Sequence, residues 1–488
     1  MRKSDRDRER SASRTACVFE GQCDGCPNRF GIEWVKRSPW PCRSGPFFVG
    51  LTQMDKSPSV GGPATPRARR VYELLLLGAA MWSAIYARTT LGPLQEAIRV
   101  SLALSDNQIA VLQGPALSVP FVVAAIPLGL AINRFSRVRL IFLFALFNLI
   151  GSAGSALAPN FGTLLVLRGL IGVTSTGTWP IACSVLADLF AATERGRASM
   201  LLLIGGAGGM SSAFAVGGAL LPVSGSGLDA WRWAMLGLSA PLVPITLLLL
   251  LMREPSRTDT RSEPPSTSEV FIQLWNLRAV LCPLVAAMVA VAGIADGATT
   301  VWAASVFSRR FALPPDRIGA IMAMILLVNS LFGPILGGTL TDVCQRSDGA
   351  RRTMTVLIGC SMVSVPTALF AVAPGVSSMS ILFALFTASA SAVSVVVVLL
   401  TLSIVPNALR GICISLMSAA GLFAAFAIGP LMVSMISGAI GGPAMIGTAL
   451  SVLCVGSCIL GVLLLVRGRR YFRGSGACKV GALVGRRL

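Results

Sequence analysis

The sequence predicts an all-α, polytopic membrane protein in which twelve transmembrane helices form two six-helix, pseudo-symmetric bundles. The chain has 488 residues, of which 54% are hydrophobic and only 13% are charged, and its mean hydropathy is +0.74. Soluble chains carry about 25% charged residues. The charges here cluster between apolar runs, each long enough to cross a hydrocarbon layer of roughly 30 Å.

The net charge of +20 would indicate nucleic-acid binding in a soluble chain. No Lys occurs between Lys56 and Lys479, however, and most Arg residues lie in short turns between the apolar runs. This placement is the topology signal of membrane proteins, which keep Arg and Lys on the cytosolic side. We therefore expect a lipid bilayer around the protein and no nucleic-acid partner.

A turn motif occurs twice, which indicates an internal repeat. The first copy reads PLGLAINRFSRVR over 127–139, and the second reads GGTLTDVCQR over 337–346. Equivalent positions are 209 residues apart (338 minus 129, and 342 minus 133): Gly129 with Gly338, and Asn133 with Asp342. Two copies at this spacing predict two halves of one bundle.

Five regions follow from the hydropathy and charge pattern. They are a disordered cytosolic tail at 1–70, an N-terminal bundle at 71–252, a central cytosolic loop at 253–278, a C-terminal bundle at 279–466 and a basic cytosolic tail at 467–488. Translation from Met54 is an alternative start. The predicted spans are 71–92, 107–133, 138–158, 162–190, 196–222, 231–252, 279–307, 316–343, 353–373, 377–405, 409–437 and 443–466.

The turns between the spans separate by charge, which predicts the orientation. Two turns on the uncharged side break the pattern, one with Arg99 and one with Arg309, Arg310 and Arg317. By the positive-inside bias, both termini are expected to be cytosolic. We further expect a multi-pass protein of the plasma (inner) membrane that is a monomer. The positive side holds Arg67, Arg69, Arg70, Arg134, Arg137, Arg139, Arg195, Arg197, Arg253, Arg257, Arg261, Arg278, Arg346, Arg351, Arg352 and Arg410.

Four of the 12 cysteines lie in the N-terminal tail, at Cys17, Cys23, Cys26 and Cys42. Only the gap between Cys23 and Cys26 matches zinc-ligand spacing, and the chain has no His. We expect no metal site and no cofactor.

Three ionisable residues stand out deep within the spans and are therefore candidate functional residues: Arg88, Arg168 and Asp296. Arg88 and Asp296 are 208 residues apart (296 minus 88), which nearly equals the repeat offset. We expect them at equivalent places in the two halves, facing each other across a central cavity and paired when its outer mouth is closed. The simpler alternatives are an Arg88 that reaches the lipid headgroups and an Asp296 that meets water at a helix end.

Proton coupling requires a group that titrates. Arg does not titrate at accessible pH, and the spans contain neither His nor Lys. Asp296 is the deepest carboxylate, whereas Asp188 and Asp342 lie near cytosolic helix ends. If transport is proton-driven, Asp296 is the first candidate carrier; if Asp296 is permanently paired, facilitated diffusion is the alternative.

Two six-span halves, a central polar loop and the pattern G-x-x-x-D-R-x-x-R after spans two and eight resemble the major facilitator superfamily. More narrowly, LSDNQIAVLQG from Leu104, IPLGLAINRFSRVRLI from Ile126, NFGTLLVLRGLIGV from Asn160 and SVLADLFAATERGRA from Ser184 resemble its bacterial spinster-like branch. The likeness is weaker in the second half, where it rests on Trp302 and the second turn motif. The resemblance implies alternating access around a midplane site, without covalent chemistry.

Arg88, Arg168 and Asp296 are the candidates for a substrate or gate role because of their depth in the spans, and the resemblance adds Trp302. The turn pattern, in which charges at helix ends lock one conformation, predicts conformational-switch roles for Gly129, Asn133, Arg134, Arg137, Asp188, Arg195, Arg197, Gly338 and Asp342. The resemblance matches Arg88, Arg168, Asp188, Arg134, Arg137 and Asp342 to functional positions of the family. The chain departs from the family pattern at three positions that the resemblance links to switching, coupling or binding. Asn133 replaces the first turn Asp, Ala87 replaces the Asp before Arg88, and Ser175 stands where a Glu is expected.

The sequence therefore favours a secondary transporter of a small organic solute, anionic or amphipathic, with a proton or another ion as the open coupling partner. A multidrug or lipid exporter of the same fold is an alternative. A non-transporting membrane sensor or scaffold is a further alternative of another class, which the lost coupling residues would fit. An enzyme is not expected, because no nucleophile, base or metal cluster occurs at a recognisable spacing.

Overall fold

The computed structural model describes residues 67–191, 194–223, 227–255, 275, 277–345, 349–405 and 407–472. All described helices lie within residues 67–472. Several predictions fall outside the described residues: the tail with Cys17, Cys23, Cys26 and Cys42, the loop residues Arg257 and Arg261, Arg346 of the second turn motif, and the C-terminal tail from 473.

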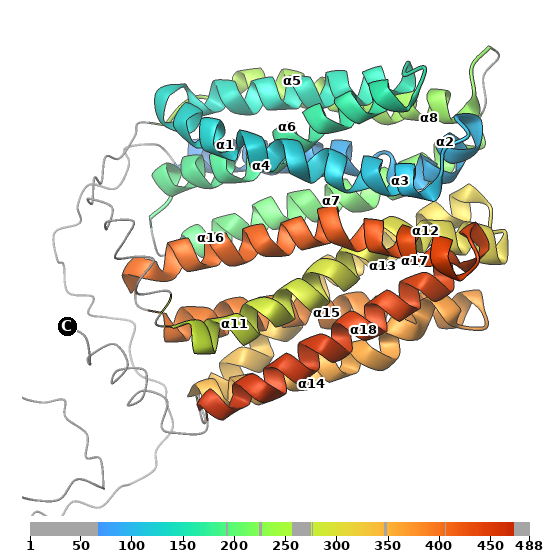
Figure 1. Cartoon of the computed structure of the whole chain (residues 1–488). Helices are drawn as coiled ribbons and strands as arrows, with labels where there is room; N and C mark the ends of the chain where they lie inside the picture. The colour runs from blue at the N-terminus through green and yellow to red at the C-terminus, as the bar shows by residue number, and fades with distance from the viewer. Residues whose placement is uncertain are drawn as a thin grey trace, which may run out of the picture. The chain divides into compact units, whose positions relative to one another are not determined.

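The first half consists of helices that run side by side (Figure 1). Their bounds are α1 (Arg67–Thr89), η1 (Gly92–Leu94), α2 (Gln95–Ser101), α3 (Asp106–Gln113), α4 (Pro115–Arg134), α5 (Arg137–Ala156), α6 (Phe161–Leu189), α7 (Arg195–Leu220), α8 (Ala230–Ser239), α9 (Leu242–Leu248) and η2 (Leu249–Leu251).

The second half repeats this arrangement, drawn from yellow to red in Figure 1. Its bounds are α11 (Arg278–Ala287), η3 (Met288–Ala295), α12 (Asp296–Phe311), α13 (Pro315–Gln345), α14 (Gly349–Thr367), η4 (Ala368–Val372), α15 (Val376–Ile404), α16 (Asn407–Phe423), η5 (Ala424–Ile428), α17 (Gly429–Ile440), η6 (Pro443–Met445), α18 (Ile446–Gly468) and η7 (Arg469–Phe472).

Twelve helices of the described residues are long and apolar enough to cross a membrane, so the predicted number and type of spans are confirmed. The first span differs from its prediction, because it continues through α2 to Ser101. The chain turns at Thr90 and Leu91 and re-enters a helix at Gly92, followed by Pro93, a residue suited to the first turn of a helix. Arg99 therefore lies on a helix and not in a turn.

Two π-helical segments occur among the described residues of the second half. One is η3, which ends directly before Asp296, and the other is η5, which ends before Gly429 and Pro430. A π segment adds a residue to a helical turn and is frequent at functional sites. The helical repeat therefore changes directly before Gly429 and Pro430.

Glycines bring helices into close contact. Between the halves, α7 and α13 cross where a Cβ on Gly218 would lie 2.6 Å from the Pro315 carbonyl oxygen and 2.8 Å from the Gly319 Cα. Small residues allow such backbone approach in lipid, where packing rather than hydrophobicity joins helices. The two halves therefore contact each other directly at this crossing.

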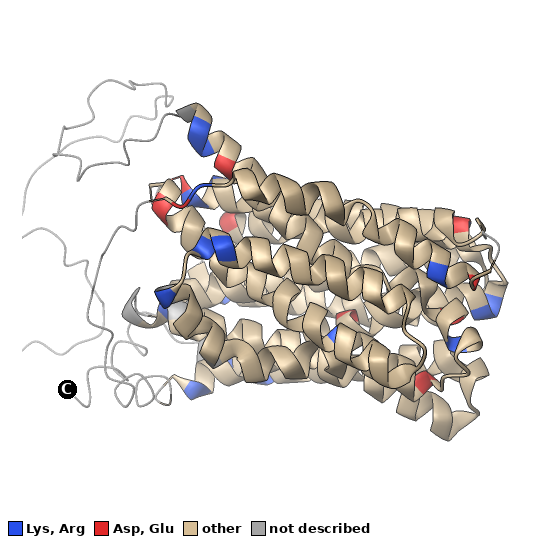
Figure 2. Ribbon diagram, turned by 90° about the horizontal axis from the view of Figure 1, so that it is seen from above, with Lys and Arg blue, Asp and Glu red and all other residues tan. Residues whose placement is uncertain are grey.

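Charged residues gather at the two ends of the helices, with few between them (Figure 2). We call the end that holds Arg99, Arg232 and Arg309 the outer end, following the orientation that the sequence predicts. The end that holds Arg137 and Arg195 is then the inner end.

Candidate functional site

A cavity of about 260 Å³ lies between the two halves, and both Arg88 and Asp296 line it. Its wall in the first half comes from α1, η1, α3, α4, α6 and α7, and its wall in the second half from η3, α12, α16 and η5. Its polar side chains are Arg88, Thr89, Gln113, Arg168, Asp296 and Thr300, and its larger apolar side chains are Leu117, Met210, Phe214, Val301, Leu422 and Phe426.

Arg168 is the most deeply buried of these polar residues, with 1% of its surface exposed. Its Nε donates to the Leu112 carbonyl at 3.2 Å, and its Nη2 donates to the Arg88 carbonyl at 2.9 Å. Both carbonyls lie in the last turn of a helix, α3 or α1, where the helix dipole favours a cation. Its buried Nη1 has no hydrogen-bond partner among the residues that the structure describes. Arg168 thus carries one unused donor at the cavity.

Arg88 reaches across to the second half. Its guanidinium lies over the Phe426 ring, 4.6 Å from the ring centroid, as in a cation–π contact. The structure brings Arg88 and Asp296 into one cavity, as the repeat spacing predicts, but no ion pair joins these two residues. The aromatic ring, which the sequence does not reveal, gives the Arg88 cation another partner.

Asp296 begins α12 at the point where η3 ends. It lines the cavity from the second half, whereas Arg88 and Arg168 line it from the first. Asp296 is the one carboxylate among the described residues that line this cavity. The cavity therefore has a cationic wall in one half and an acidic group in the other.

Trp302 does not line the cavity, although the sequence indicates a gate or substrate role. Its ring is fully buried, and its Nε1 donates to the Pro430 carbonyl at 3.0 Å. This bond ties α12 to α17 within the second half. The position of Trp302 fits a packing residue.

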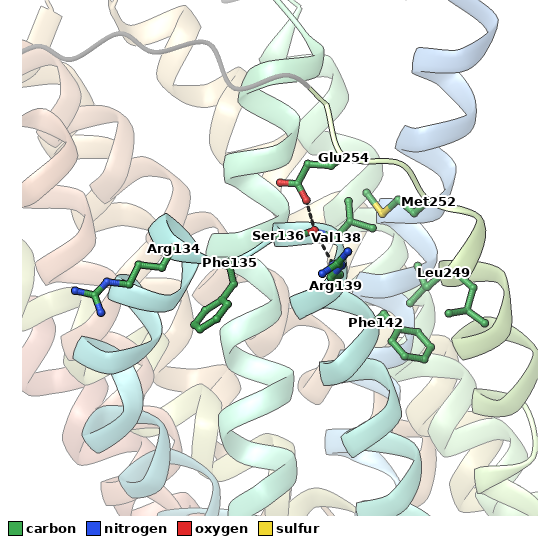
Figure 3. A pocket seen from close by; sticks show the side chains of 10 residues that line it. Arg134, Phe135, Ser136, Val138, Arg139, Phe142, Leu249, Met252 and Glu254 are labelled. Atoms are coloured by element: carbon green, nitrogen blue, oxygen red, sulfur yellow. Dashed lines mark hydrogen bonds between the residues drawn. The ribbon is translucent and has the colours of Figure 1, made fainter.

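The inner end holds a cluster around Arg137. Its Nη2 lies 2.6 Å from an Asp188 carboxylate oxygen, and its Nε donates to the Glu254 carboxylate at 3.1 Å. The cluster joins α5, the end of α6 and the residues after η2, and it adjoins a pocket of about 640 Å³. Figure 3 shows Glu254 reaching toward Ser136, whereas Arg134 points away from this carboxylate. The sequence predicts Arg137 and Asp188 as switch residues but misses Glu254, which stands beside the long polar loop.

Burial raises the pKa of the Glu254 carboxyl, but hydrogen bonds outweigh this and hold the pKa below its ordinary value. The donors are Ser136 Oγ, the backbone amides of Val138 and Arg137, and the Arg137 side chain. Glu254 is therefore ionised at neutral pH and keeps its pairing with Arg137.

Equivalent arginines close two inner helix ends. Arg195 donates through Nε to the Phe190 carbonyl at 3.1 Å and through Nη2 to the Ala187 carbonyl at 2.8 Å. Arg410 donates through Nε to the Val405 carbonyl at 3.0 Å. Both arginines thus bind carbonyls at a helix C-terminus, Arg195 at the end of α6 and Arg410 at the end of α15.

Most of the other predicted switch residues are exposed or have few close neighbours. A Cβ added to Gly129 or Gly338 would meet nothing within 4 Å, so neither glycine marks a close approach in this conformation. Arg134, Arg197 and Asp342 are exposed, and Asn133 lies in the last turn of α4.

The outer end carries a charge cluster that the sequence does not reveal. Arg309 of α12 donates to both carboxylate oxygens of Asp106, at 2.8 and 2.6 Å, and its Nη2 lies 2.8 Å from a Glu96 oxygen. Arg99 also pairs with Glu96, at 3.0 Å. Arg99 and Arg309, two of the four arginines that break the positive-inside pattern, are therefore paired with acids at the same end. The sequence offers Glu96 and Asp106 as signals, but not their partner in the other half.

The sequence model of the Major Facilitator Superfamily matches residues 77–306. Curated relatives include a D-xylose transporter of Levilactobacillus brevis, which is 32% identical over 26% of this chain and 27% of that protein. A probable 4-methylmuconolactone transporter of Cupriavidus pinatubonensis is 23% identical over 55% and 61%. Protein spinster homolog 3 of Homo sapiens is 28% identical over 35% and 33%. The chain thus spans between about a quarter and three fifths of the length of these relatives.

Solved structures with the same fold include a bacterial homolog of the human lysosomal transporter Spinster, in an inward-facing and unoccupied conformation. It superposes with a TM-score of 0.68 at 20% identity, over 84% of this chain and 97% of that one. A D-xylose-proton symporter gives a TM-score of 0.62 at 18% identity, over 81% and 97%. Spinster proteins therefore recur among the sequence relatives and the fold relatives. The family model thus matches slightly less than half of the chain, and the solved structures share its fold over both halves.

Proposed function

We propose that the protein is a secondary transporter that moves a small organic solute, anionic or amphipathic, across the membrane by alternating access. The observation that carries this proposal is the unpartnered Nη1 of Arg168 at a cavity between two repeated halves. A buried cation without a full set of acceptors favours a ligand that supplies one. Arg88 adds a second positive charge to the same wall.

The solute is small. A cavity of about 260 Å³ falls below the range of roughly 300–1,000 Å³ that is usual for drug-sized ligands. The names of two relatives, a D-xylose transporter and a probable 4-methylmuconolactone transporter, are in keeping with solutes of this size. A carboxylate-bearing solute would use the cationic wall, and its apolar part would contact Phe214 and Phe426.

A multidrug or lipid exporter is the second candidate. Met210, Phe214, Leu422 and Phe426 give the cavity an apolar side that suits an amphipathic molecule. Spinster proteins among the relatives keep this reading open to test. Enlargement of the cavity in another conformation would be needed for a long acyl chain.

Asp296 is the proposed coupling residue. It is a carboxylate within a membrane-spanning segment that is not paired with Arg88, so it can exchange a proton during the cycle. When Asp296 is protonated and therefore neutral, an anionic solute is the negative charge that Arg88 and Arg168 can bind in the cavity. Transport of an anion together with a proton follows from this arrangement.

The test is uptake into proteoliposomes that contain the purified protein, with labelled 4-methylmuconolactone, D-xylose and a set of small carboxylates, in the presence and absence of a pH gradient. We expect uptake of an anionic compound that an inward-directed proton gradient accelerates. Arg168→Gln should abolish it, and Asp296→Asn should remove the effect of the gradient. Thr355→Val, which removes an exposed hydroxyl bonded only to its own helix, is the control.

Two outcomes would overturn parts of this proposal. If Asp296→Asn and Arg88→Ala leave uptake intact singly and together, these residues have no role in coupling or binding. If neither these solutes nor amphipathic dyes and lysolipids move, while the protein remains folded, a non-transporting sensor or scaffold replaces the transporter.

A further inference from the structure

A continuous chain of hydrogen bonds leads from the cavity wall to the charged outer end. Gln113 Nε2 donates to Gln95 Oε1, and Gln95 Nε2 donates to the Ser305 hydroxyl. Ser305 Oγ in turn donates to a Glu96 oxygen, which Arg309 also contacts. Gln113 lines the cavity, so the chain begins where a solute would bind.

The direction of this chain is fixed by one carbonyl. Gln95 Nε2 also donates to the Val301 carbonyl at 3.0 Å, and a carbonyl can only accept. The Gln95 amide therefore presents its nitrogen to α12 and its oxygen to Gln113. Gln113 must then contribute an N–H to this bond, which makes the bond sensitive to any competing acceptor.

The outer end of the chain joins the two halves of the molecule. Glu96 and Asp106 belong to α2 and α3, whereas Arg309 belongs to α12. The fork of Arg309 holds both Asp106 oxygens, and its side chain is only 14% exposed. Charge-assisted, two-pronged bonds of this kind are the stronger class of hydrogen bond. We call these three residues the outer latch.

We propose that Gln113 is a solute-sensing residue that couples occupancy of the central cavity to the outer latch through Gln95 and Ser305. This inference rests on the proposed transport function. Gln113 directly follows Leu112, whose carbonyl is held by Arg168, so a solute anion at Arg168 lies beside the Gln113 amide. An oxygen of the anion that accepts the Gln113 N–H takes it from Gln95.

Loss of that bond weakens the outer latch in steps. Gln95 then has no donor on its oxygen, and its hold on Ser305 and Val301 loosens because hydrogen bonds in a chain reinforce one another. Ser305 in turn supports Glu96 less well against the desolvation of that carboxylate. The bound solute thus favours separation of the halves at the outer end, whereas the empty cavity keeps them closed.

The experiment measures how often the outer end opens. Ala292→Cys places a thiol at the cavity, and a membrane-impermeant maleimide is added to the outside of oriented proteoliposomes. Labelling is counted above that of the parent chain with its native cysteines. Arg309→Gln should raise the labelling rate about tenfold or more, and Arg309→Lys, which keeps the charge but loses the fork, should raise it less.

The coupling is tested by a double-mutant comparison. Gln113→Leu should raise labelling, and the Gln113→Leu, Arg309→Gln double variant should label no faster than Arg309→Gln alone, because both act through one chain. Thr246→Val is the control: its buried hydroxyl bonds its own helix at the Leu242 carbonyl and does not line the cavity, so labelling should stay unchanged.

Wild-type labelling in Gln113→Leu, or effects of the two substitutions that multiply, would overturn the proposal. These readouts need no transported solute. Failure of uptake with intact coupling would therefore reject the transport function, and uptake without coupling would reject only the role of Gln113.

Discussion

Glu254 is the residue whose charge state most clearly supports the inner cluster. Its folded-state pKa is lowered, so its stabilisation is fully present above the unfolded value of about 4.3 and is lost as pH falls through the folded pKa. We expect Glu254→Gln to lower the unfolding temperature at pH 7 by about 1–3 °C, because the carboxylate is partly exposed. The difference from wild type should shrink as pH falls toward about 3.

The measurement is thermal unfolding in detergent between pH 3 and 8. Glu194→Gln provides the matched control, since its side chain is 54% exposed and makes one bond, to Arg70 at 3.3 Å. We expect no change there. An equal effect of the two substitutions at all pH values would show that Glu254 has no special place in the cluster.

Single residues differ in how well the sequence reveals them. Arg88 and Asp296 stand out because a charge in an apolar span is costly, and their spacing matches the repeat, so they are found without coordinates. Gln95 and Gln113 are neutral and lie near helix ends, where polar residues are common. Their roles depend on partners from another helix, which no local pattern encodes.

The crossing of α7 and α13 is the helix contact whose change should matter most. A side chain on Gly218 would meet the backbone of α13, which cannot yield as a flexible side chain can. Overpacking costs about 1–3 kcal/mol, enough to change a two-state population roughly tenfold. We therefore expect Gly218→Val to open the outer end, to raise outside labelling of Ala292→Cys and to slow transport.

Gly438→Val is the control for this substitution. Gly438 also lies on a helix near the outer end, but nothing lies within 4 Å of an added Cβ there. Both substitutions add the same β-branched side chain to a helix. Faster labelling in both variants, or in neither, would mean that the crossing does not limit opening.

The number of helices could be predicted because a segment in lipid must form all its backbone hydrogen bonds internally. A long apolar run therefore has to be a helix. The prediction ends the first span too early, because Glu96 and Arg99 have the composition of a turn. Their helix, α2, persists because these side chains pair with each other and with Arg309. The π segments η3 and η5 have the same apolar composition as the flanking helix and leave no sequence signal.

At the scale of the whole molecule, the two halves share their inner helix ends but not their outer charges. Arg195 and Arg410 close equivalent helices by the same type of bond. The outer latch is instead asymmetric, with acids in the first half and the cation in the second. Similar bonds at the inner helix ends suit two bundles that rock against each other. The outer latch adds a free-energy cost that applies to opening at the outer end alone.

The orientation of the bundle can be tested along one helix. α6 has 29 residues and is therefore about 44 Å long, more than the roughly 30 Å of hydrocarbon. Leu157, which is 68% exposed, lies just before α6, and Gly196, where an added Cβ meets nothing within 4 Å, lies just after it. In intact cells, an impermeant maleimide should label Leu157→Cys but not Gly196→Cys, and inside-out vesicles should reverse this. Since an even number of spans returns the chain to its starting side, the same result would place both termini in the cytosol. The opposite pattern would invert the molecule and make the outer latch a cytosolic one.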